Sequence, residues 1–410
     1  MGKPKIRFEG YSEDWEQRKL GDISSLITKG TTPKDKSGTG EVNFIKVENI
    51  NDFSGDIVGM SKISLEEHQG YLKRSQLQEG DILFSIAGTL GRVTSVNKAI
   101  LPANTNQALS IIRLKEGNLE YVKTCLKGNV VADFIRRNPT IGAQPNLSLE
   151  QVSNLEIGIP SEAEQEKIGL YFSNLDHLIT LHQRKCDETK TLKKYMLQKM
   201  FPQNGEKVPE IRFDGFTEDW EQRKFGEITE LKSASRVHKD EWTSNGVPFY
   251  RSSDVMAAIN GTENEKAFIS EELYEKLSKV SGKLEEGDIL VTGGGSVGNP
   301  YIVPDNKPLY TKDADLLWIK NKGKFHSYFL YEFFFSPTFR NYLGSISHVG
   351  TIAHYTITQL SDTPICLPSF EEQKKVGEYF QSLDNLITLH QRKCDELRSV
   401  KKFMLQNMFI

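Results

Sequence analysis

Two long segments of the chain, 161–201 and 369–410, carry apolar residues in alternating steps of four and three, which is the spacing of a coiled-coil seam. Each opens on a Ser-x-x-Glu pattern, at Ser161 and Ser369, which predicts a capping box at a helix N-terminus. We expect two helices of about 60 Å each, paired antiparallel because a narrow seam needs an equally long partner. The seam positions are Ile168, Phe172, Leu175, Ile179, His182, Cys186 and Thr189 in the first helix, and Val376, Phe380, Leu383, Ile387, His390, Cys394 and Leu397 in the second.

The remaining sequence alternates short apolar, β-branched runs with segments of helical periodicity. The runs are bounded by Gly, Pro or Asn, as strands are, and cover Asp81–Ile86, Ala108–Leu114, Asp288–Thr292 and Leu316–Lys320. Helices are expected at Tyr121–Arg137 and His326–Leu343. The predicted fold class is therefore α+β, with two similar mixed α/β domains separated by a pair of long antiparallel coiled-coil helices.

The chain contains the same unit twice. Residues 6–23 return at 211–228 with 13 of 18 positions identical, and residues 175–201 return at 383–409 with 20 of 27 identical. The segment EGDILFSIAGTLG at 79–91 returns as EGDILVTGGGSVG. The offset drifts only from 205 to 208, so the halves match almost end to end. A period of this length excludes solenoid repeats and indicates a duplicated domain pair with an internal pseudo-twofold relation.

Between the matching blocks the apolar residues keep their places while the polar residues change. NFIKVENI at 43–50 corresponds to PFYRSSDV at 248–255, and PANTNQALSI at 102–111 corresponds to YTKDADLLWI at 310–319. Binding residues usually lie on loops held by a rigid core, so this pattern favours two copies of one scaffold that present different recognition surfaces. Drift in unconstrained loops is the alternative for any single position.

Composition narrows the class of protein. The chain has 410 residues, 52 basic against 55 acidic side chains and a net charge of −3, so a nucleic-acid site must be a local patch or be completed by a partner. No stretch reaches the roughly 18 apolar residues of a membrane span, and the N-terminus lacks the apolar region of a signal peptide. Four cysteines without a CxxC pair fit a reducing compartment, so we expect a globular cytoplasmic protein.

Motifs of several enzyme classes are absent or incomplete. Gly293, Gly295 and Gly298 satisfy G-x-G-x-x-G, but the first half has Ile86 at the first of these positions, and an extended run follows where a phosphate-binding helix would start. A tight turn is the preferred interpretation. The stretch lacks the Gly-Lys-Ser/Thr of a P-loop, and the Asn-Pro step at 138–139 lacks the Asn-Pro-Pro-aromatic run of an amino-methyltransferase. We therefore expect no catalytic site.

The two long helices leave two further hypotheses open. His182 and Cys186, like His390 and Cys394, lie four residues apart on the seam, so an antiparallel pairing could gather a zinc site; ordinary core packing is the alternative. The helix tails are basic, with six Lys or Arg against two acids at 184–201 and five against two at 392–409. These tails are either a phosphate-facing or partner-facing surface or a solvated face suited to the helix C-terminal dipole.

Together these residues resemble the specificity subunit of type I restriction-modification systems. The resemblance rests on the duplicated halves, the S-E-D-W-E-Q-R-K-L-G-D opening, the G-D-I-L-F-S-x-x-G-T-L-G loop, the I-P-S-x-x-E-Q-x-K-I helix start and the L-I-T-L-H-Q-R-K-C helix, and it covers essentially the whole chain. It implies target-recognition domains at 1–160 and 211–368, conserved spacer helices at 161–201 and 369–410, and a linker at 202–210.

The resemblance also implies a function. Such a subunit is not itself an enzyme: it binds double-stranded DNA at a bipartite, asymmetric target, each recognition domain reads one half, and the helices set the unread gap. Its partners are two methyltransferase subunits and restriction or translocase subunits. S-adenosylmethionine, ATP and Mg²⁺ are expected on those partners, and no intrinsic cofactor or metal is implied for this chain.

Base reading requires side chains with paired hydrogen-bond groups, such as Arg or Lys for guanine and Asn or Gln for adenine. The repeat comparison marks polar loop positions as candidate DNA contacts. In the first half these are Lys46, Asn49, Ser85, Thr89, Arg92, Asn104, Asn106, Gln107, Gln144 and Asn146. In the second half they are Arg251, Ser252, Ser253, Thr292, Ser296, Asn299, Lys312, Thr351 and His354.

Two other classes of function compete with DNA recognition. One is an enzyme in its own right, against which the missing motifs speak. The other is a coiled-coil scaffold without a DNA-reading role, for which the two diverged regions would be interchangeable.

Overall fold

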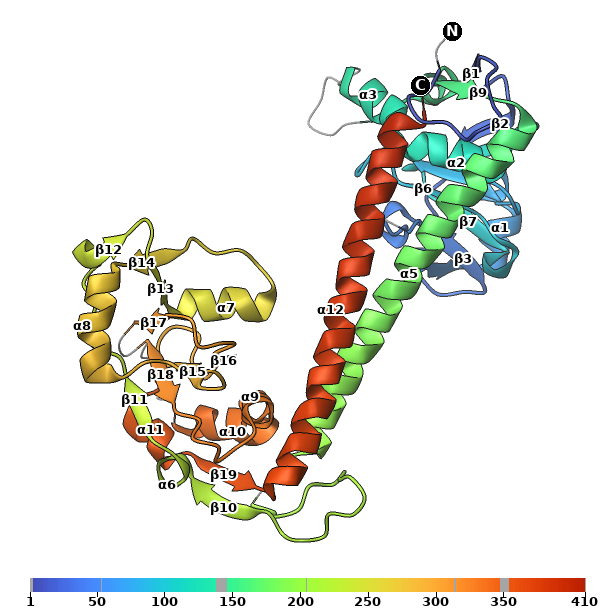
Figure 1. Cartoon of the computed structure of the whole chain (residues 1–410). Coiled ribbons are helices and arrows are strands. Elements are labelled where there is room, and N and C mark those ends of the chain that lie inside the picture. The colour runs from blue at the N-terminus through green and yellow to red at the C-terminus, as the bar shows by residue number, and fades with distance from the viewer. Residues whose placement is uncertain are drawn as a thin grey trace. The chain divides into compact units, whose positions relative to one another are not determined.

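A computed structural model describes residues 3–52, 54–137, 146–203, 205–312, 315–346 and 354–409 of the chain (Figure 1). The chain forms two compact units. The first consists of Met1–Lys185 with His390–Ile410, and the second of Cys186–Leu389. Each unit therefore combines one repeat with the first part of its own long helix and the last part of the other one.

The first unit contains three small sheets. An antiparallel pair joins β1 (Glu16–Lys19) to β9 (Glu156–Ile159). The main sheet is antiparallel throughout and consists, in order, of β2 (Ser24–Lys29), β8 (Leu109–Leu114), β5 (Ile82–Ser85) and β6 (Val93–Ser95). In the third sheet the central strand pairs antiparallel on one side and parallel on the other, in the order β4 (Ser61–Ile63), β3 (Val42–Ile45) and β7 (Ala103–Thr105).

The second unit repeats this arrangement. Its antiparallel pair is β10 (Glu221–Lys224) with β19 (Pro364–Leu367). Its main sheet consists, in order, of β11 (Leu231–Ser233), β18 (Leu316–Ile319), β15 (Ile289–Thr292) and β16 (Pro300–Ile302). Its third sheet consists of β12 (Trp242–Thr243), β14 (Ala267–Ile269), β13 (Val247–Tyr250) and β17 (Tyr310–Thr311). The four predicted strands are confirmed as the central strands of the two main sheets, where their residues are almost all buried.

Helices fill the connections between the strands. In the first repeat they are α1 (Leu65–Gln69), α2 (Leu119–Lys127), α3 (Asn129–Arg137), α4 (Leu149–Ser153), α5 (Glu162–Lys199) and the 3-10 helices η1 (Val47–Asn49), η2 (Lys73–Ser75) and η3 (Lys98–Ile100). In the second they are α6 (Phe225–Ile228), η4 (Lys239–Glu241), α7 (Ser252–Asn260), α8 (Glu271–Ser281), α9 (Ser327–Phe333), α10 (Pro337–Ile346), α11 (Ile357–Asp362) and α12 (Phe370–Asn407). Within the described residues, no helix is both long enough and apolar enough to cross a membrane.

Two predicted helices are each divided in the structure. The segment 121–137 forms α2 and α3, and the segment 326–343 forms α9 and α10. Gly128 separates the first pair, and Pro337 occupies the first position of α10. Both segments are helical, as predicted, and each is divided because glycine weakens a helix interior and proline fits only the first turn of a helix.

The two long helices, α5 and α12, pair antiparallel in the first unit. Asp176 of α5 binds Lys401 of α12. Six residues further along α5, the Nδ1 atom of His182 lies 3.0 Å from the Nδ1 atom of His390. Residue numbers therefore fall along α12 as they rise along α5, which confirms the predicted direction of pairing in this unit.

The same pairing continues in the second unit. Cys186 Sγ donates to the carbonyl oxygen of Ile387 at 3.8 Å. Lys193 Nζ lies 2.7 Å from both carboxylate oxygens of Asp384. The two helices begin at Glu162 and Phe370, directly after the predicted cap serines, and end within three residues of the predicted ends.

A buried ion pair ties each long helix to the start of its own repeat. Arg7 donates from Nε and Nη2 to the two carboxylate oxygens of Glu164 at 2.7 and 2.8 Å, and the Glu164 side chain is fully buried. Arg212 binds Glu372 with the same two distances. The glutamates of the predicted capping boxes are thus bound by arginines distant in sequence, because a bidentate, charge-assisted pair is stronger than a bond to a backbone N–H.

The end of each long helix inserts an aromatic side chain into a core. Phe201, just after α5, lies in the core of the second unit with ring centroids 6.2 Å from Trp220 and 5.4 Å from Phe329. Phe409, just after α12, lies against the core of the first unit, 6.4 Å from Trp15. Each long helix therefore begins in the core of one unit and ends in the core of the other.

Candidate nucleic-acid interface

A groove in the first unit lies among the loop after β2, strands β3 and β4, and the turn after β7. It has a volume of about 250 Å³ and is lined by Thr32, Pro33, Asp35, Lys36, Gly38, Phe44, Lys46, Ser61, Lys62, Ile63 and Asn106. Two of the predicted contact residues, Lys46 and Asn106, are in this lining. A third, Gln107, lies at its edge, because Thr32 donates a hydrogen bond to its side-chain oxygen.

The second unit has a groove at the corresponding place. It has a volume of about 1120 Å³ and is lined by Arg236, Val237, His238, Lys239, Trp242, Thr243, Ser244, Arg251, Glu265, Lys266, Ala267, Lys312 and Asp315. Arg251 is the repeat counterpart of Lys46, since both follow the strand that pairs in parallel, β13 or β3. Two predicted contact residues, Arg251 and Lys312, thus lie together.

Both grooves are lined by more basic than acidic side chains. The first has three lysines against one aspartate, and the second has two arginines and three lysines against Glu265 and Asp315. Basic side chains attract DNA phosphates, whereas sequence is read by the donors and acceptors beside them. In a chain of net charge −3, these are the local basic patches that a nucleic-acid site would require.

The Arg251 side chain is held in one orientation. Its backbone N–H and its Nε both donate to Asp254 Oδ2, at 2.8 and 2.9 Å. Its guanidinium lies 5.5 Å from the ring centroid of Trp242. The hydrogen bonds to Asp254 raise the pKa of Arg251 above its ordinary value. Nη2 also donates to Asp254 Oδ1 at 3.3 Å and to the Glu265 carbonyl, so these bonds leave the Nη1 amino group for a DNA base.

Asn49 of the first unit occupies the place of Asp254. Its side-chain oxygen accepts the backbone N–H of Lys46 at 2.8 Å, and its Nδ2 donates to the Gly59 carbonyl at 2.8 Å. Asn49 is buried, so its hydrogen bonds hold the backbone that presents Lys46. The Lys46 ammonium is itself 3.7 Å from Glu48 and is half-exposed.

The glycine-containing loop of each repeat is a tight hairpin, and a hydroxyl group makes the same two hydrogen bonds in both. Ser85 Oγ donates to the Thr89 carbonyl at 2.6 Å and accepts the Arg92 N–H at 2.7 Å. Thr292 makes the corresponding bonds to the Ser296 carbonyl and from the Asn299 N–H. The second loop connects antiparallel strands β15 and β16, which confirms the tight-turn interpretation over a dinucleotide site.

The remaining predicted residues fall into three groups. Buried residues whose hydrogen bonds lie inside the fold are Asn49, Ser85, Asn104 and Thr292. Exposed residues are Thr89, Gln107, Asn146, Ser253, Ser296 and His354, and partly buried ones are Arg92, Ser252 and Asn299. Gln144 and Thr351 lie outside the described residues.

Asn146 and His354 are repeat counterparts that meet the hairpin loops. Asn146 forms an antiparallel bridge with Ala87, and His354 forms one with Gly294. The exposed side chains of Asn146 and His354 therefore lie beside the hairpin loop of their own unit. Predicted contact residues from separate parts of the sequence thus come together there.

Sequence reasoning missed several basic residues of the grooves. These are Lys36 and Lys62 in the first unit, and Arg236, Lys239 and Lys266 in the second. A signal was present in the second repeat, where the basic run RVHK at 236–239 precedes Trp242, because basic clusters next to aromatic residues are typical of nucleic-acid sites. The repeat comparison did not mark this run because its counterpart in the first half has a different composition.

The histidine and cysteine residues of the helix seam are packed as core residues. Cys394 Sγ donates to the Ile179 carbonyl at 3.6 Å, and both cysteines of the seam, Cys186 and Cys394, are fully buried. Among the described residues, no three His, Cys, Asp or Glu side chains form a group that could hold a metal ion. The thiols of Cys186 and Cys394 are thus placed as core packing predicts, each against a backbone carbonyl of the partner helix.

The pair of histidines predicts a pH dependence of stability. Burial, and then the neighbouring charges of His390, Lys185 and Lys393, lower the pKa of His182 below its ordinary 6.5. A histidine with a lowered pKa in the folded state stabilises the fold above pH 6.5, and this contribution is lost as the pH falls below 6.5. We expect the melting temperature to fall between pH 7.5 and 5.5 by more in the natural chain than in His182→Asn. The exposed His177 on the same helix offers the control, because His177→Asn should behave as the natural chain does.

Comparison with known proteins shows the family of the chain. The family model described as the type I restriction modification DNA specificity domain matches it twice, at residues 12–191 and 217–399. The putative type I restriction enzyme MjaX specificity subunit of Methanocaldococcus jannaschii is 24% identical, and the match covers 95% of this chain and 91% of that one. The type I restriction enzyme EcoBI specificity subunit of Escherichia coli is 28% identical over 40% of this chain and 36% of its own length.

Solved structures share the fold. The S subunit of a type I restriction-modification system from M. genitalium superposes with a TM-score of 0.65 at 14% identity, covering 100% of this chain and 99% of that one. A chain from a type I restriction-modification assembly gives a TM-score of 0.53 at 17% identity, with 96% and 97% covered. Because the specificity-domain model matches both repeats, the chain belongs to the family of type I restriction-modification specificity subunits, which are DNA-recognition components and not catalytic ones.

Proposed function

We propose that this chain recognises a bipartite, asymmetric DNA target, with one half read in each groove. The observation that carries the proposal is a pair of basic grooves at equivalent places of two repeats whose linings differ. Lys46 and Asn106 line one groove, and Arg251 and Lys312 line the other. Two different readers on one scaffold suit a target whose two halves have different sequences.

The long helices are proposed to set the unread gap between the half-targets. Support comes from their anchoring, because each begins in the core of one unit and ends in the core of the other. A helix fixed at both ends is a suitable spacer.

The same helices are proposed to dock two methyltransferase subunits, with restriction subunits joining the complex. Large apolar side chains are exposed at repeat-related positions of both helices, namely Leu178 and Leu386, Leu192 and Val400, and Tyr195 and Phe403. Paired apolar surfaces suit two copies of one partner. S-adenosylmethionine, ATP and Mg²⁺ would be bound by these partners.

A domain replacement tests the modular recognition. Residues 229–367 are replaced by the corresponding region of another specificity subunit, and the chimaera is co-expressed with the cognate methyltransferase subunit in a host that lacks adenine methylation. Methylated adenines are mapped by single-molecule sequencing. We expect one half of the methylated motif to change while the other half and the gap stay the same. Change in both halves contradicts the proposal, and an unchanged motif from an assembled complex supports the scaffold function instead.

Arg251 offers a finer test of base reading in the second groove. We expect Arg251→Ala to lose about 1–3 kcal/mol of discrimination at one base pair of the second half-target. Binding competition among duplexes with single substitutions across the target measures this loss. Lys46→Ala is the matched control: it should relax a position in the other half and leave the second half unchanged. Equal weakening for all sequences would identify Arg251 as a phosphate contact.

A further inference from the structure

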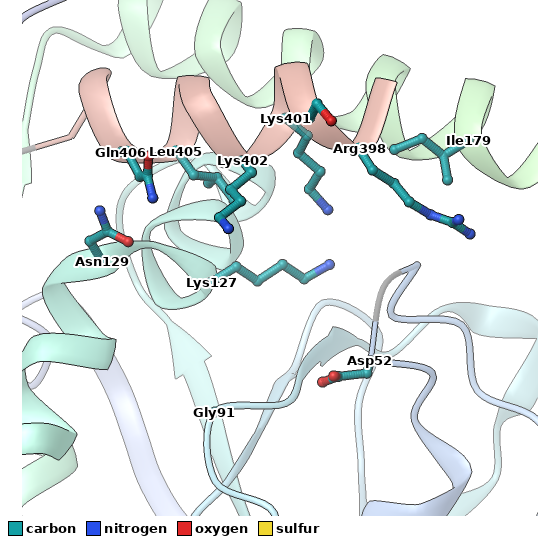
Figure 2. Close-up of a pocket in the computed structure, with 11 residues that line it drawn as sticks. Asp52, Gly91, Lys127, Asn129, Ile179, Arg398, Lys401, Lys402, Leu405 and Gln406 are labelled. Atoms are coloured by element: carbon teal, nitrogen blue, oxygen red, sulfur yellow. The ribbon is translucent and has the colours of Figure 1, made fainter. Parts of the chain in front are cut away.

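A cavity in the first unit lies beside the last turns of α12. It has a volume of about 490 Å³ and is lined by Asp52, Gly91, Lys127, Asn129, Ile179, Arg398, Ser399, Lys401, Lys402, Leu405 and Gln406. Figure 2 shows the ammonium groups of Lys127, Lys401 and Lys402 directed into the same space from α2 and α12. None of these residues was a predicted base contact, but Arg398, Lys401 and Lys402 belong to the basic helix tail 392–409, for which a phosphate-facing surface was one of the two hypotheses.

Positive charge in this cavity exceeds negative charge. Lys127 and Lys401 share one carboxylate, that of Asp176, with Lys127 Nζ 3.6 Å from Asp176 Oδ2. Lys402 is exposed and forms no ion pair with the described part of the chain. The carboxylate that lines the opposite side, Asp52, is exposed and lies 3.8 Å from Arg92 Nε.

Burial makes this cluster of cations unfavourable unless an anion is bound. The side chains of Lys127 and Lys401 are each only 12% exposed. Burial lowers the pKa of Lys127, Asp176 opposes this, and Lys401 and Lys123 add to the lowering, so that the pKa lies at about 8. A bound anion would place a further negative charge beside these ammonium groups and favour their charged forms.

The second unit has a different set of ionisable side chains at the corresponding place. Phe335 is the repeat counterpart of Lys127, and Lys193 is that of Lys401. Lys193 Nζ lies 2.8 Å from Glu332 and 2.7 Å from Asp384, so one cation there faces two carboxylates. The cationic cavity is therefore specific to the first unit and does not follow from the repeated scaffold.

We propose that this cavity binds one backbone phosphate of duplex DNA next to the first half-target, and that the second unit makes no such contact. The inference rests on the proposed function. The position favours DNA as the source of the phosphate, because Gly91 ends the hairpin loop that carries the exposed Thr89. Asn129 and Gln406 are exposed at the cavity and add neutral donors for further phosphate oxygens.

The test measures how salt affects DNA binding by the full chain in complex with its methyltransferase subunit. One phosphate contact contributes about 1 to the slope of log affinity against log salt concentration. We expect Lys402→Ala to reduce this slope by about 1 on target and non-target duplexes alike, without changing the methylated motif. The matched control is Lys194→Ala, the exposed repeat counterpart on α5, which should leave the slope unchanged.

A chemically modified duplex locates the phosphate. Neutral methylphosphonates are placed one at a time along the first half-target. A methylphosphonate at one position should weaken DNA binding by the natural complex severalfold. The same substitution should not weaken binding by the Lys402→Ala complex any further. An additive loss at every position would show that Lys402 does not contact a phosphate.

The outcomes separate this inference from the proposed function. If the natural complex methylates a split motif but Lys402→Ala keeps its slope, the inference fails and the proposed function stands. If the natural complex reads no DNA sequence, the proposed function itself fails. Loss of methyltransferase binding in Lys402→Ala would assign the surface to a protein partner. Inorganic phosphate could instead stabilise the natural complex but not the Lys402→Ala complex, while the salt slope of DNA binding is the same for both. That result would assign the cavity to a free anion. Either this result or the loss of methyltransferase binding overturns the inference.

Discussion

Replacing Phe201 with alanine is expected to lower the free energy of unfolding of the second unit by about 3–5 kcal/mol. Phe201 is 2% exposed and packs against Trp220, Phe329 and Phe380, with ring centroids 5.4 to 6.2 Å apart. Removing its ring leaves a cavity in a core that belongs mainly to the other repeat. Urea denaturation gives the loss in stability, and peptide-level hydrogen exchange shows which unit loses protection.

The location of the effect is the informative part of this experiment. Phe201 follows the long helix of the first repeat, yet the lost protection should appear in peptides of 220–380 and spare those of the first unit. Leu192→Ala on the same helix removes a side chain that is 44% exposed and should change stability by less than about 0.5 kcal/mol. Loss of protection confined to the first unit would contradict the division of the helices between two cores.

Replacing Arg7 with methionine is expected to destabilise the first unit by about 3–5 kcal/mol. The substitution keeps most of the volume of the side chain but leaves the fully buried Glu164 carboxylate without its two bonds from Arg7. A buried charge without its partner costs more free energy than the ion pair contributes. Removing only one partner is therefore more destabilising than removing both. The same denaturation measurement checks it.

A double replacement distinguishes the unpaired charge from lost packing. Arg7→Met combined with Glu164→Gln should recover much of the loss, because no charge is then buried alone. The pair Lys3 and Asp14, 3.5 Å apart and about half-exposed on both sides, supplies a surface comparison. Lys3→Ala should change stability by less than about 1 kcal/mol. A loss of that size for Arg7→Met as well would show that the Arg7–Glu164 bridge contributes little.

Several motifs that reveal the family stabilise the fold. Trp15 of the opening motif is 1% exposed in the first core. Gln165, next to Glu164 at the helix start, donates to the Pro160 carbonyl and accepts the Asn118 N–H, both at 2.9 Å. The residues that repeat best in sequence are therefore the ones that hold helix and domain together. The groove residues differ between the repeats, as the proposed pair of different half-targets would require.

Groove-lining residues could be predicted from the sequence only where the repeat kept the backbone and changed the side chain. Lys46 and Arg251 are such a pair, and both line a groove. Asn104 was also a candidate, but it is fully buried and donates to the Leu72 carbonyl at 2.9 Å. A polar residue at a strand end has the same appearance in sequence whether it faces solvent or a neighbouring loop, so burial had to come from the tertiary structure.

The sequence by itself determined the duplication, the central strands of the main sheets and the two long helices with their antiparallel pairing. These features depend on local periodicity and on near-identity between the halves, which are both written along the chain. Only the tertiary structure decided that each helix ends in the core of the other unit, that Arg7 binds Glu164, and that lysines distant in sequence gather in one cavity of the first unit. Such contacts join residues more than 100 positions apart, and their energies depend on burial and geometry, which no local pattern records.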